Sequence, residues 1–447
     1  MKEQAHSSGP PDWKRTSLGQ ALPIRYGKAR NNKYGTVRVN TPIYGSSGKI
    51  DTFNRALTIG PSLIIGRKGN VGAAYYSPEP CWPIDTVYFA EASANEDLRF
   101  FKYLLDHLQL ARMDRSTAVP GLSRDDYNAM EVFVPELDQQ RFIVAEIEKQ
   151  FSRLDEAITN LKRVKANLKR YKAAVLKAAV EGKLTEDWRK QHPEVEPGSK
   201  LLQRILAERR AKWSRKGKYK DPQVPDITGL PGLPKTWAWS SIEAICSEIV
   251  DCPHSTPKWE PAGHVCLRTT EFRPGRLDLS DVRYVSPSTY EKRVQRLTPR
   301  ENDIVYSREG GILGVACMIP PRLDPCLGQR MLLLRTHQLI TSRFLMHWLN
   351  SSHLLARVRS LTGGSASPHL NVGEVKLFPA PVAPVAEQVA IVADVERRLS
   401  VIDELEAAVE ANLARADRLR QSVLGQAFSG RLHLSNGVGL GATTPKA

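Results

Sequence analysis

Two short glycine-rich segments each carry an arginine that could contact nucleic acid. The segment IIGRKGNVGAA at 64–74 resembles VYSREGGILGVA at 305–316 with one inserted residue, so that Arg67 corresponds to Arg308. This pattern predicts a tight turn between two strands. An arginine at the tip of such a turn can donate two hydrogen bonds to guanine O6 and N7, or to a phosphate. The alternative is a hairpin whose arginine is only solvated.

The first part of the chain holds further basic and amide side chains that could contact DNA. Lys68 directly follows Arg67, and a second group lies between residues 25 and 33. Side chains of these types donate hydrogen bonds to phosphate oxygens, which position a protein on a duplex without reading its sequence. The candidates in this second group are Arg25, Lys28, Arg30, Asn31, Asn32 and Lys33.

Sequence motifs of common catalytic chemistry are missing. The chain has no GxxxxGK[ST] phosphate loop, and GRKGNVG at 66–72 has the wrong spacing for one. It has no Asn/Asp-Pro-Pro-aromatic element, with which amino-methyltransferases hold a flipped base, and no HExxH or GxSxG. We therefore expect a recognition protein that is not an enzyme and carries no cofactor of its own.

One set of side chains could offer ligands to a metal ion. Cys252-Pro-His254 and His264-Val-Cys266 together supply four possible zinc ligands. One-residue gaps are not the usual ligand spacing, so we expect no metal site. The six cysteines include no CxxC pair, which argues against a disulfide scaffold and favours a reducing compartment.

The charge of the chain indicates a polyanionic partner. Lys and Arg number 64 against 48 Asp and Glu, a formal net charge of +16. The densest basic run, from Arg209 to Lys220, is explained equally well by phosphate contact and by a solvated helix face. The apolar run at 331–340 is too short to span a bilayer and the first residues lack a signal-peptide core, so we expect a cytoplasmic protein.

An internal repeat shows that the chain is built twice. Residues 139–184 and 387–432 align without gaps at a constant offset of 248, with identities such as Ile143/Ile391 and Gly182/Gly430. Each repeat follows a long segment that lacks this similarity, which gives the order variable, helix, variable, helix. Such an order indicates a protein that reads two sites.

Both repeats have the spacing of a heptad seam, in which apolar residues recur every three or four positions. Lys165 and Lys172 interrupt this seam, so we expect a short antiparallel pair or bundle, in which the two helices pack on each other, in place of a long free coiled coil. The alternative is two unrelated amphipathic helices, each packed on its own domain. The seam residues are Ile147, Phe151, Leu154, Ile158, Leu161, Leu168 and Val175, and Val395, Leu399, Ile402, Val409, Leu413, Ala416 and Val423.

The variable segments have the composition of β structure. Runs such as SLIIGRKGNVGAAYY and DTVYFAEA combine β-branched and aromatic residues with glycine-rich turns, and LRFFKYLLDHL at 98–108 predicts one helix packed on the strands. The second variable segment opens on Trp237 as the first opens on Trp13, but is about 24 residues longer up to its repeat. Between the first repeat and the second variable segment, the sequence predicts a linker with a basic helix and a Pro- and Gly-rich end.

The chain resembles the specificity (S) subunits of type I restriction–modification systems over nearly its whole length. The resemblance rests on VPELDQQRFIVAEIE and APVAPVAEQVAIVADVE at the starts of the repeats, and on AAVEGKLT and QAFSGRLH at their ends. It also includes IYGSSGKI, DCPHSTPKW, GHVCLRTTEF and GQRMLLLR in the variable segments. Each piece alone is weak evidence, whereas the combination is specific.

The resemblance implies a non-catalytic subunit with two target recognition domains, each reading one half of a split DNA sequence. It also implies two modification subunits as partners, which use S-adenosylmethionine to methylate adenine, and ATP-dependent restriction subunits in the full complex. The fold class we expect is α+β: two mainly β domains, each with a packed helix, separated by two long helices in an antiparallel coiled-coil pair.

The expected boundaries follow from this organisation: target recognition domains at 1–138 and 236–386, spacer helices at 139–185 and 387–434, a basic linker at 186–235 and a disordered tail at 435–447. Helices of about 40 residues, at roughly 1.5 Å per residue, would place half-sites about one to two DNA turns apart. Because the variable segments differ, we expect an asymmetric bipartite target. The competing interpretation is a non-enzymatic helical scaffold whose β domains bind protein.

Overall fold

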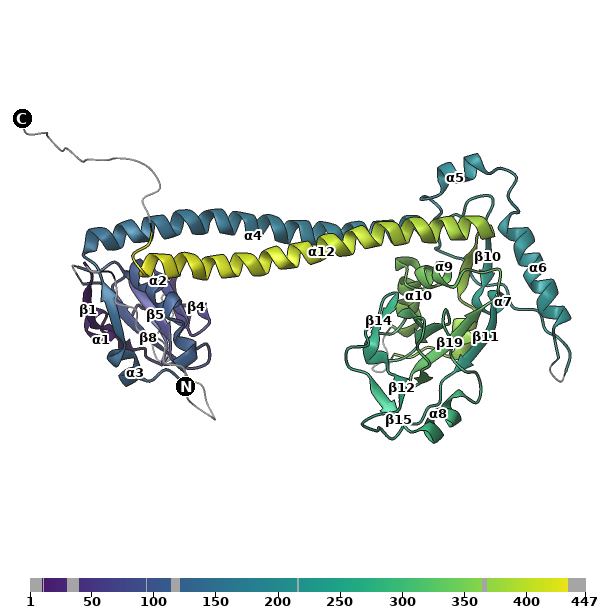
Figure 1. Ribbon diagram of the computed structural model, residues 1–447, viewed down its shortest axis with the longest axis horizontal. Coiled ribbons are helices and arrows are strands. Elements are labelled where there is room, and N and C mark those ends of the chain that lie inside the picture. The colour runs from purple at the N-terminus through teal and green to yellow at the C-terminus, as the bar shows by residue number, and fades with distance from the viewer. Residues whose placement is uncertain are drawn as a thin grey trace, which may run out of the picture. The chain divides into compact units, whose positions relative to one another are not determined.

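The computed structural model describes residues 10, 12–29, 40–93, 95–113, 121–214, 217–363 and 368–432. The chain divides into two compact units. Unit 1 combines residues 1–164 with residues 408–447, and unit 2 contains residues 165–407. Figure 1 shows the elements of both units along the chain. Among the described residues, no helix is long and apolar enough to cross a membrane.

Unit 1 is a mixed α and β structure, and its described strands form three separate sheets. One sheet has the order β2-β8-β5-β6, a second has the order β4-β3-β7, and β1 pairs with β9. Its strands are β1 (Lys14–Ser17), β2 (Arg25–Tyr26), β3 (Thr41–Gly45), β4 (Gly48–Phe53), β5 (Ser62–Gly66), β6 (Ala74–Ser77), β7 (Trp82–Pro83), β8 (Val87–Glu91) and β9 (Glu131–Val134). Its shorter helices are α1 (Leu18–Ala21), α2 (Leu98–Leu108), the 3-10 helix η1 (Leu110–Met113) and α3 (Arg124–Ala129).

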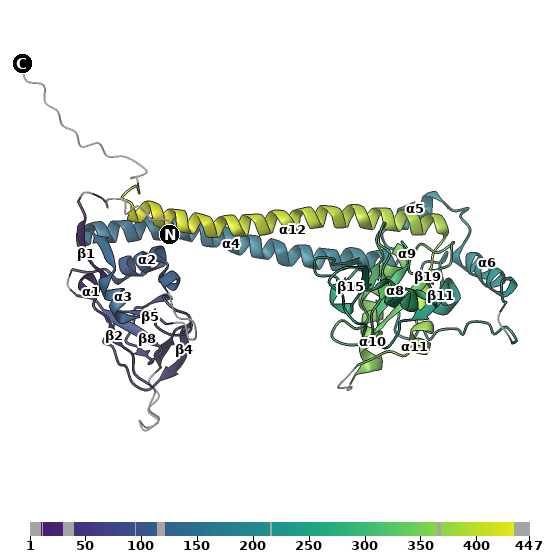
Figure 2. The same ribbon diagram turned by 60° about the horizontal axis from the view of Figure 1, so that its bottom comes forward.

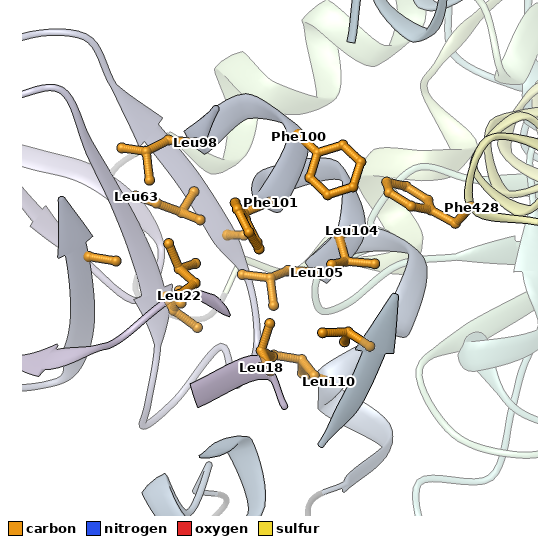
Figure 3. Close-up of a cluster of buried hydrophobic side chains, with 14 of the residues drawn as sticks. Leu18, Leu22, Leu63, Leu98, Phe100, Phe101, Leu104, Leu105, Leu110 and Phe428 are labelled. Atoms are coloured by element: carbon orange, nitrogen blue, oxygen red, sulfur yellow. The ribbon is translucent and has the colours of Figure 1, made fainter. Parts of the chain in front are cut away.

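Helix α2 closes the core of unit 1, as its sequence predicts. Asp97 caps its first turn by accepting a hydrogen bond from the Arg99 amide at 2.9 Å. Its apolar residues recur at spacings of three and four, so one face is buried against β5 and β6. Figure 3 shows this cluster, in which the ring of Phe100 meets that of Phe428 edge-on at 5.4 Å. The core of unit 1 is therefore built from both ends of the sequence.

Unit 2 repeats the strand order of unit 1. Its sheets have the orders β11-β19-β16-β17 and β15-β12-β18, and β10 pairs with β20. The strands are β10 (Ala238–Ser241), β11 (Cys246–Asp251), β12 (His264–Leu267), β13 (Phe272–Arg273), β14 (Arg276–Leu277), β15 (Arg283–Val285), β16 (Ile304–Ser307), β17 (Ala316–Met318), β18 (Cys326–Leu327), β19 (Met331–Thr336) and β20 (Pro379–Val382). Its shorter helices are α5 (Glu186–Gln191), α6 (Gly198–Ala211), α7 (Ile242–Ile245), η2 (Thr269–Glu271), α8 (Pro287–Val294), α9 (Ser342–Leu349), α10 (Ser352–Thr362) and α11 (Val372–Lys376).

The extra length of the second variable segment consists of additional elements. The hairpin of β13 and β14 lies between β12 and β15, where unit 1 has only the turn between β3 and β4. Helix α8 lies between β15 and β16, whereas the described residues between β4 and β5 of unit 1 contain no helix. The duplication therefore extends through the variable segments, although their sequences differ.

The segment expected to be a linker contributes to the core of unit 2. Helix α6 buries Leu201 and Ile205 against the elements of this core. The helix ends at Ala211, so the basic run that begins at Arg209 lies mostly beyond it. The basic helix predicted for this run is therefore wrong, since Gly217 within the run and Pro222 after it favour an irregular backbone.

Two helices of 44 residues, α4 (Leu137–Val180) and α12 (Val385–Phe428), carry the sequence repeat. In unit 1, Ile147 and Phe151 of α4 share a buried cluster with Val423 near the end of α12. In unit 2, Val175 near the end of α4 shares a cluster with Ile391 near the start of α12. The start of each helix meets the end of the other, so the pair is antiparallel (Figures 1 and 2). This confirms the predicted coiled-coil pair.

Equivalent ion pairs link the two helices within each unit. Asp155 pairs with Arg420 in unit 1, and Asp403 pairs with Lys172 at 2.9 Å in unit 2. Both the aspartates and their partners are related by the repeat offset of 248. Lys172, which interrupts the apolar seam, therefore has a cross-helix partner.

Both repeats end at a glycine because the backbone turns left-handed there. Gly182 and Gly430 each have φ of 71°. The amide of the next residue donates back to a helix carbonyl, from Lys183 to Ala178 at 2.8 Å and from Arg431 to Gln426 at 2.9 Å. This is the Schellman arrangement, which favours glycine at the turning position.

Candidate nucleic-acid interface

The two arginine-bearing segments form matching loops, which we call the arginine loops: residues 67–73 in unit 1 and 308–315 in unit 2. Each connects antiparallel strands, β5 with β6 and β16 with β17. In unit 1 the Gly72 amide donates to the Gly66 carbonyl at 2.8 Å, and in unit 2 the Gly314 amide donates to the Ser307 carbonyl at 2.9 Å. The hairpins inferred from the sequence are therefore present, with the extra residue inside the second loop.

Left-handed glycines shape both loops. Gly69 and Gly72 have φ of 78° and 74°, and Gly310 and Gly314 have φ of 83° and 85°. An added side chain at Gly72 would place Cβ only 2.6 Å from the Cβ of Leu110. Glycine is needed here for both conformation and space.

Each arginine loop is also joined to a later segment in the same way. The Leu122 amide donates to the Arg67 carbonyl at 2.9 Å, and the Leu370 amide donates to the Arg308 carbonyl at 2.8 Å. A neighbouring β-bridge joins Lys68 to Gly121 in one unit and Glu309 to His369 in the other. Several loops therefore meet at the same end of each central sheet.

In unit 1, the side chain of Arg67 lies half-buried on aromatic rings. Its guanidinium carbon is 5.1 Å from the ring centroid of Tyr26 and 5.9 Å from that of Tyr88. Its Nη1 donates to the Asp85 carbonyl at 3.1 Å. Arg124 lies over the same Tyr26 ring at 5.6 Å, so two guanidinium groups use one ring. Arg67 is fixed in orientation but keeps part of its surface accessible.

In unit 2, Arg308 is buried by ion pairs. Its Nε lies 3.1 Å from Asp251 Oδ1, its Nη1 lies 3.4 Å from Glu309 Oε1, and its side chain is 7% exposed. Its Nη1 also donates to the Leu370 carbonyl at 3.3 Å. Asp251 occupies the position that Tyr26 has in unit 1. In both units, the amide of the following residue donates to the carbonyl of the first residue of the neighbouring strand, which is β8 in unit 1 and β19 in unit 2. The same site therefore uses cation–π contact in one unit and an ion pair in the other.

The other residues proposed from the sequence fall into three groups. Lys28 and Lys68 are exposed; the Lys28 carbonyl accepts a hydrogen bond from Trp82 Nε1 at 2.9 Å, which anchors the backbone. Arg25 instead pairs with Glu91 and lies over the Phe89 ring at 4.7 Å. The remaining candidates lie outside the described residues: Arg30, Asn31, Asn32 and Lys33.

The comparisons with known proteins place these loops in a family. A model of the type I restriction modification DNA specificity domain matches residues 10–170, which contain the first arginine loop. The chain is 24% identical over 345 residues to the type I restriction enzyme EcoKI specificity subunit of Escherichia coli K12, covering 74% of this chain and 64% of that one. It is 21% identical over 432 residues to the Escherichia coli EcoDI specificity subunit, covering 95% and 89%.

The chain belongs to the specificity subunits of type I restriction–modification systems. Its fold agrees with that of a chain from a structural study of complex assembly and conformational transition of the type I R-M system. The TM-score is 0.61 at 17% identity, with 95% of this chain and 100% of that chain covered. The family makes DNA sequence specificity the function of the chain and disfavours the helical-scaffold interpretation.

Beside Arg308, unit 2 carries further polar side chains that were not among the candidates proposed from the sequence. Gln329 and Arg330 immediately precede β19, and His254 follows β11. The segments that contain them, GQRMLLLR and DCPHSTPKW, were noted for their family resemblance without a role for any residue. The signal available in the sequence was a basic and an amide residue directly before a strand.

The side chains considered as zinc ligands lie in separate surroundings. The ring of His264 stacks on Tyr290 at 4.1 Å, and Cys266 lies opposite Cys326 on the neighbouring strand. The hydrogen bond with Cys326, followed by burial, raises the pKa of the Cys266 thiol. Burial also raises the pKa of Cys252, which accepts a hydrogen bond from the Met331 amide at 3.4 Å. In the described part of the chain no three potential ligands converge.

Proposed function

We propose that this specificity subunit reads an asymmetric bipartite DNA target, with one half-site contacted by unit 1 and the other by unit 2. The observation that carries the proposal is the duplicated strand order, with an arginine loop at the same place in each sheet. A domain that repeats in this way supplies two similar surfaces, and each can dock on one stretch of duplex.

The asymmetry follows from the different chemistry around the two arginine loops. Tyr26 supports Arg67 in unit 1, whereas Asp251 supports Arg308 in unit 2. Unit 2 also has the β13–β14 hairpin and α8, which have no counterpart in unit 1. Surfaces that differ in shape and charge select different base sequences.

The domain roles proposed here keep the boundaries inferred from the sequence, with residues 1–138 and 236–386 as target recognition domains and α4 and α12 as spacers. A helix of 44 residues is about 66 Å long at 1.5 Å per residue. One turn of B-DNA is about 34 to 36 Å. We expect half-sites separated by about one to two turns, with unread base pairs between them.

In unit 1, we assign DNA contact to Arg67, Lys28 and Lys68, and, from the sequence alone, to Arg30, Asn31 and Lys33. Lys28 and Lys68 are exposed, and Arg67 is partly accessible. Arg25 contributes to the electrostatic field around the arginine loop of unit 1. Its ion pair with Glu91 also holds β2 on β8. The lysines suit phosphate contact, because an ammonium group is a point charge without a fixed fork of donors.

The chain acts without catalysis of its own and directs partner subunits. We infer two modification subunits, which bind S-adenosylmethionine and methylate adenine, and restriction subunits in the full cytoplasmic complex. Exposed apolar side chains on the long helices support this assignment: Val401 is 50% exposed and Leu405 47% exposed. Apolar residues on a solvent-facing helix surface are typical of sites that bind other proteins.

The deciding experiment is co-expression with a cognate modification subunit, followed by mapping of methyladenine across the host genome by single-molecule sequencing. We expect a split, non-palindromic motif that is absent without the chain. A continuous or palindromic motif would refute the bipartite reading. A stable complex that adds no methylation would also contradict the proposal.

A binding titration separates the proposal from the protein-binding scaffold. Affinity of the assembled complex for a duplex that contains the mapped motif should fall steeply as salt concentration rises, because phosphate contacts release counterions. A salt-insensitive association of the same complex would favour the scaffold.

A further inference from the structure

Arg330 has a backbone conformation that is unusual for its residue type. Its φ is 68°, in the left-handed region that favours glycine. The corresponding residue of unit 1 is Thr86: the Arg67 amide donates to the Thr86 carbonyl at 3.0 Å, as the Arg308 amide donates to the Arg330 carbonyl at 3.0 Å. Thr86 is not among the residues with positive φ. Residues held in such backbone conformations cluster at functional sites.

The conformation of Arg330 is held by its neighbours. The preceding side chain, Gln329, accepts a hydrogen bond from Thr256 Oγ1 at 3.2 Å and donates to the His254 carbonyl. These bonds tie the turn before β19 to the segment that follows β11. Gln329 is therefore committed to the turn, and Arg330 projects from a fixed backbone.

The side chain of Arg330 remains accessible although its backbone is fixed. It is 60% exposed, and its Nε lies 3.6 Å from Glu309 Oε2. Glu309 also pairs with Arg308 through its other oxygen at 3.4 Å. The carboxylate thus lies between a buried guanidinium and an exposed one. The contact recorded between Arg330 and this carboxylate is made by Nε.

The adjacent arginine loop leaves room for a ligand beside Arg330. A Cβ built at Gly310 would lie 3.9 Å from Arg330 Nη1, and a Cβ built at Gly311 would meet nothing within 4 Å. Gly310 therefore lies beside the exposed guanidinium, and the space next to Gly311 is open. Glycine at such positions permits close approach of another molecule to the backbone.

We propose that Arg330 is a specificity-determining residue of unit 2, which donates to O6 and N7 of a guanine in its half-site. Arg308 is the positioning residue: it contacts no base itself and holds Asp251, Glu309 and the Arg330 backbone in place. A planar guanidinium on a fixed backbone matches the paired acceptors of guanine. This inference rests on the proposed function, and it transfers base contact in unit 2 from Arg308 to Arg330.

The test uses the subunit assembled with its modification subunits and compares methylation motifs. We expect Arg330→Ala to make one guanine position degenerate in one half-site, with the other half-site unchanged, and to weaken binding of the matched duplex about ten- to hundredfold. Arg330→Lys should not restore the guanine, because an ammonium lacks the two-pronged donor geometry.

Arg322 provides a matched control in the same unit. It is also an exposed arginine with positive φ, of 61°. Arg322→Ala removes the same charge from the same kind of backbone, and we expect the motif to stay intact. An equal loss of the guanine in Arg322→Ala, or an even decline at all sites in Arg330→Ala, would overturn the base contact.

The role of Arg308 is tested by coupling. In an Arg308→Met background, Arg330→Ala should cause little further loss of affinity for the matched duplex. If the two residues acted independently, the fold-loss of the double variant would equal the product of the two single fold-losses. If Arg308→Met fails to fold, the Arg330 variants still decide the base contact. A wild-type complex that yields no split motif refutes the proposed function, while a wild-type motif unchanged by Arg330→Ala refutes only this inference.

Discussion

Gln140 of unit 1 and Gln388 of unit 2 make the same two hydrogen bonds. The carboxamide of Gln140 donates to the Pro135 carbonyl at 2.9 Å and accepts from the Asp97 amide at 3.0 Å. The carboxamide of Gln388 donates to the Ala383 carbonyl at 2.8 Å and accepts from the Thr341 amide at 2.8 Å. Asp97 and Thr341 are the capping residues of α2 and α9. One buried glutamine at the start of each long helix therefore fixes the packed helix of its domain.

Replacing Gln388 should destabilise unit 2. The side chain is fully buried, so Gln388→Ala leaves the Thr341 amide and the Ala383 carbonyl without a partner. We expect unfolding to become easier by about 1 to 3 kcal/mol. Thermal unfolding followed by circular dichroism measures the change. Gln338→Ala, at an exposed position of the same unit, is the control, and an equal effect there would contradict the assigned role.

Glycine at the end of α4 should be required for two separable reasons. Gly182 has φ of 71°, and a Cβ there would lie 2.6 Å from Pro234 Cγ. Gly229 has φ of 76°, but its Cβ would meet nothing within 4 Å. Gly229→Ala should therefore lower the free energy of unfolding by about 1 to 2 kcal/mol, because only the left-handed backbone conformation is unfavourable for alanine. Gly182→Ala should lower the free energy of unfolding by about 1 to 3 kcal/mol more than this, because its methyl group would overlap with Pro234.

Denaturant unfolding of the two alanine variants provides the measurement. Equal losses would mean that the domain accommodates a methyl group beside Pro234 and that only the backbone matters. A larger loss for Gly229→Ala would contradict the packing at the helix end.

His347 should make the stability of unit 2 depend on pH. Burial, with a smaller contribution from Arg343, lowers the pKa of this histidine to about 4. Between about pH 6.5 and pH 4 the unfolded chain binds a proton that the folded chain does not, so stability falls as pH falls through this window. Each unit of pKa difference corresponds to about 1.4 kcal/mol, which gives a loss of about 3 kcal/mol near pH 4.

Comparison of the wild type with His347→Gln isolates this contribution. The variant should lose much of the slope of unfolding free energy against pH in that window. Burial also lowers the pKa of His337, so a smaller slope should remain. An unchanged slope would exclude His347 as its source.

The sequence was sufficient for features that repeat along it. Heptad spacing identified both long helices, and the offset of 248 aligned Gly182 with Gly430, where the backbone indeed turns at both sites. The glycine pattern likewise aligned the arginine loops. These features depend on local spacing, which a single sequence contains.

The surroundings of the arginines could not be predicted, because they depend on residues far away in sequence. Arg308 is buried by Asp251, which stands 57 positions earlier, and Arg67 lies on Tyr26, 41 positions earlier. Nothing in the two segments indicates that Tyr26 and Asp251 occupy one structural position. Similarly, the charge of the segment after α4 concealed the apolar face with which α6 enters the core.

A buried carboxylate at the start of α12 yields the last prediction. Glu387 is fully buried and accepts hydrogen bonds from Arg189 Nη1 at 2.6 Å, Thr185 Oγ1 at 2.7 Å and Trp237 Nε1 at 2.9 Å. Arg189→Met removes the only basic partner that the described residues give this carboxylate. We expect the free energy of unfolding to fall by about 3 to 5 kcal/mol, because the charge of Glu387 stays buried without compensation.

The neighbouring residue supplies the control for this prediction. Lys190 pairs with Asp187 at the surface, where its side chain is 66% exposed, so Lys190→Met should have little effect. Arg189→Met combined with Glu387→Gln should recover part of the lost stability, since the neutral amide no longer needs a cation while it can still accept from Trp237. Calorimetric unfolding of the single and double variants measures the coupling. A double variant as unstable as the two single losses added together would show that the charges act independently, whereas recovery would show that the ion pair compensates the burial of Glu387.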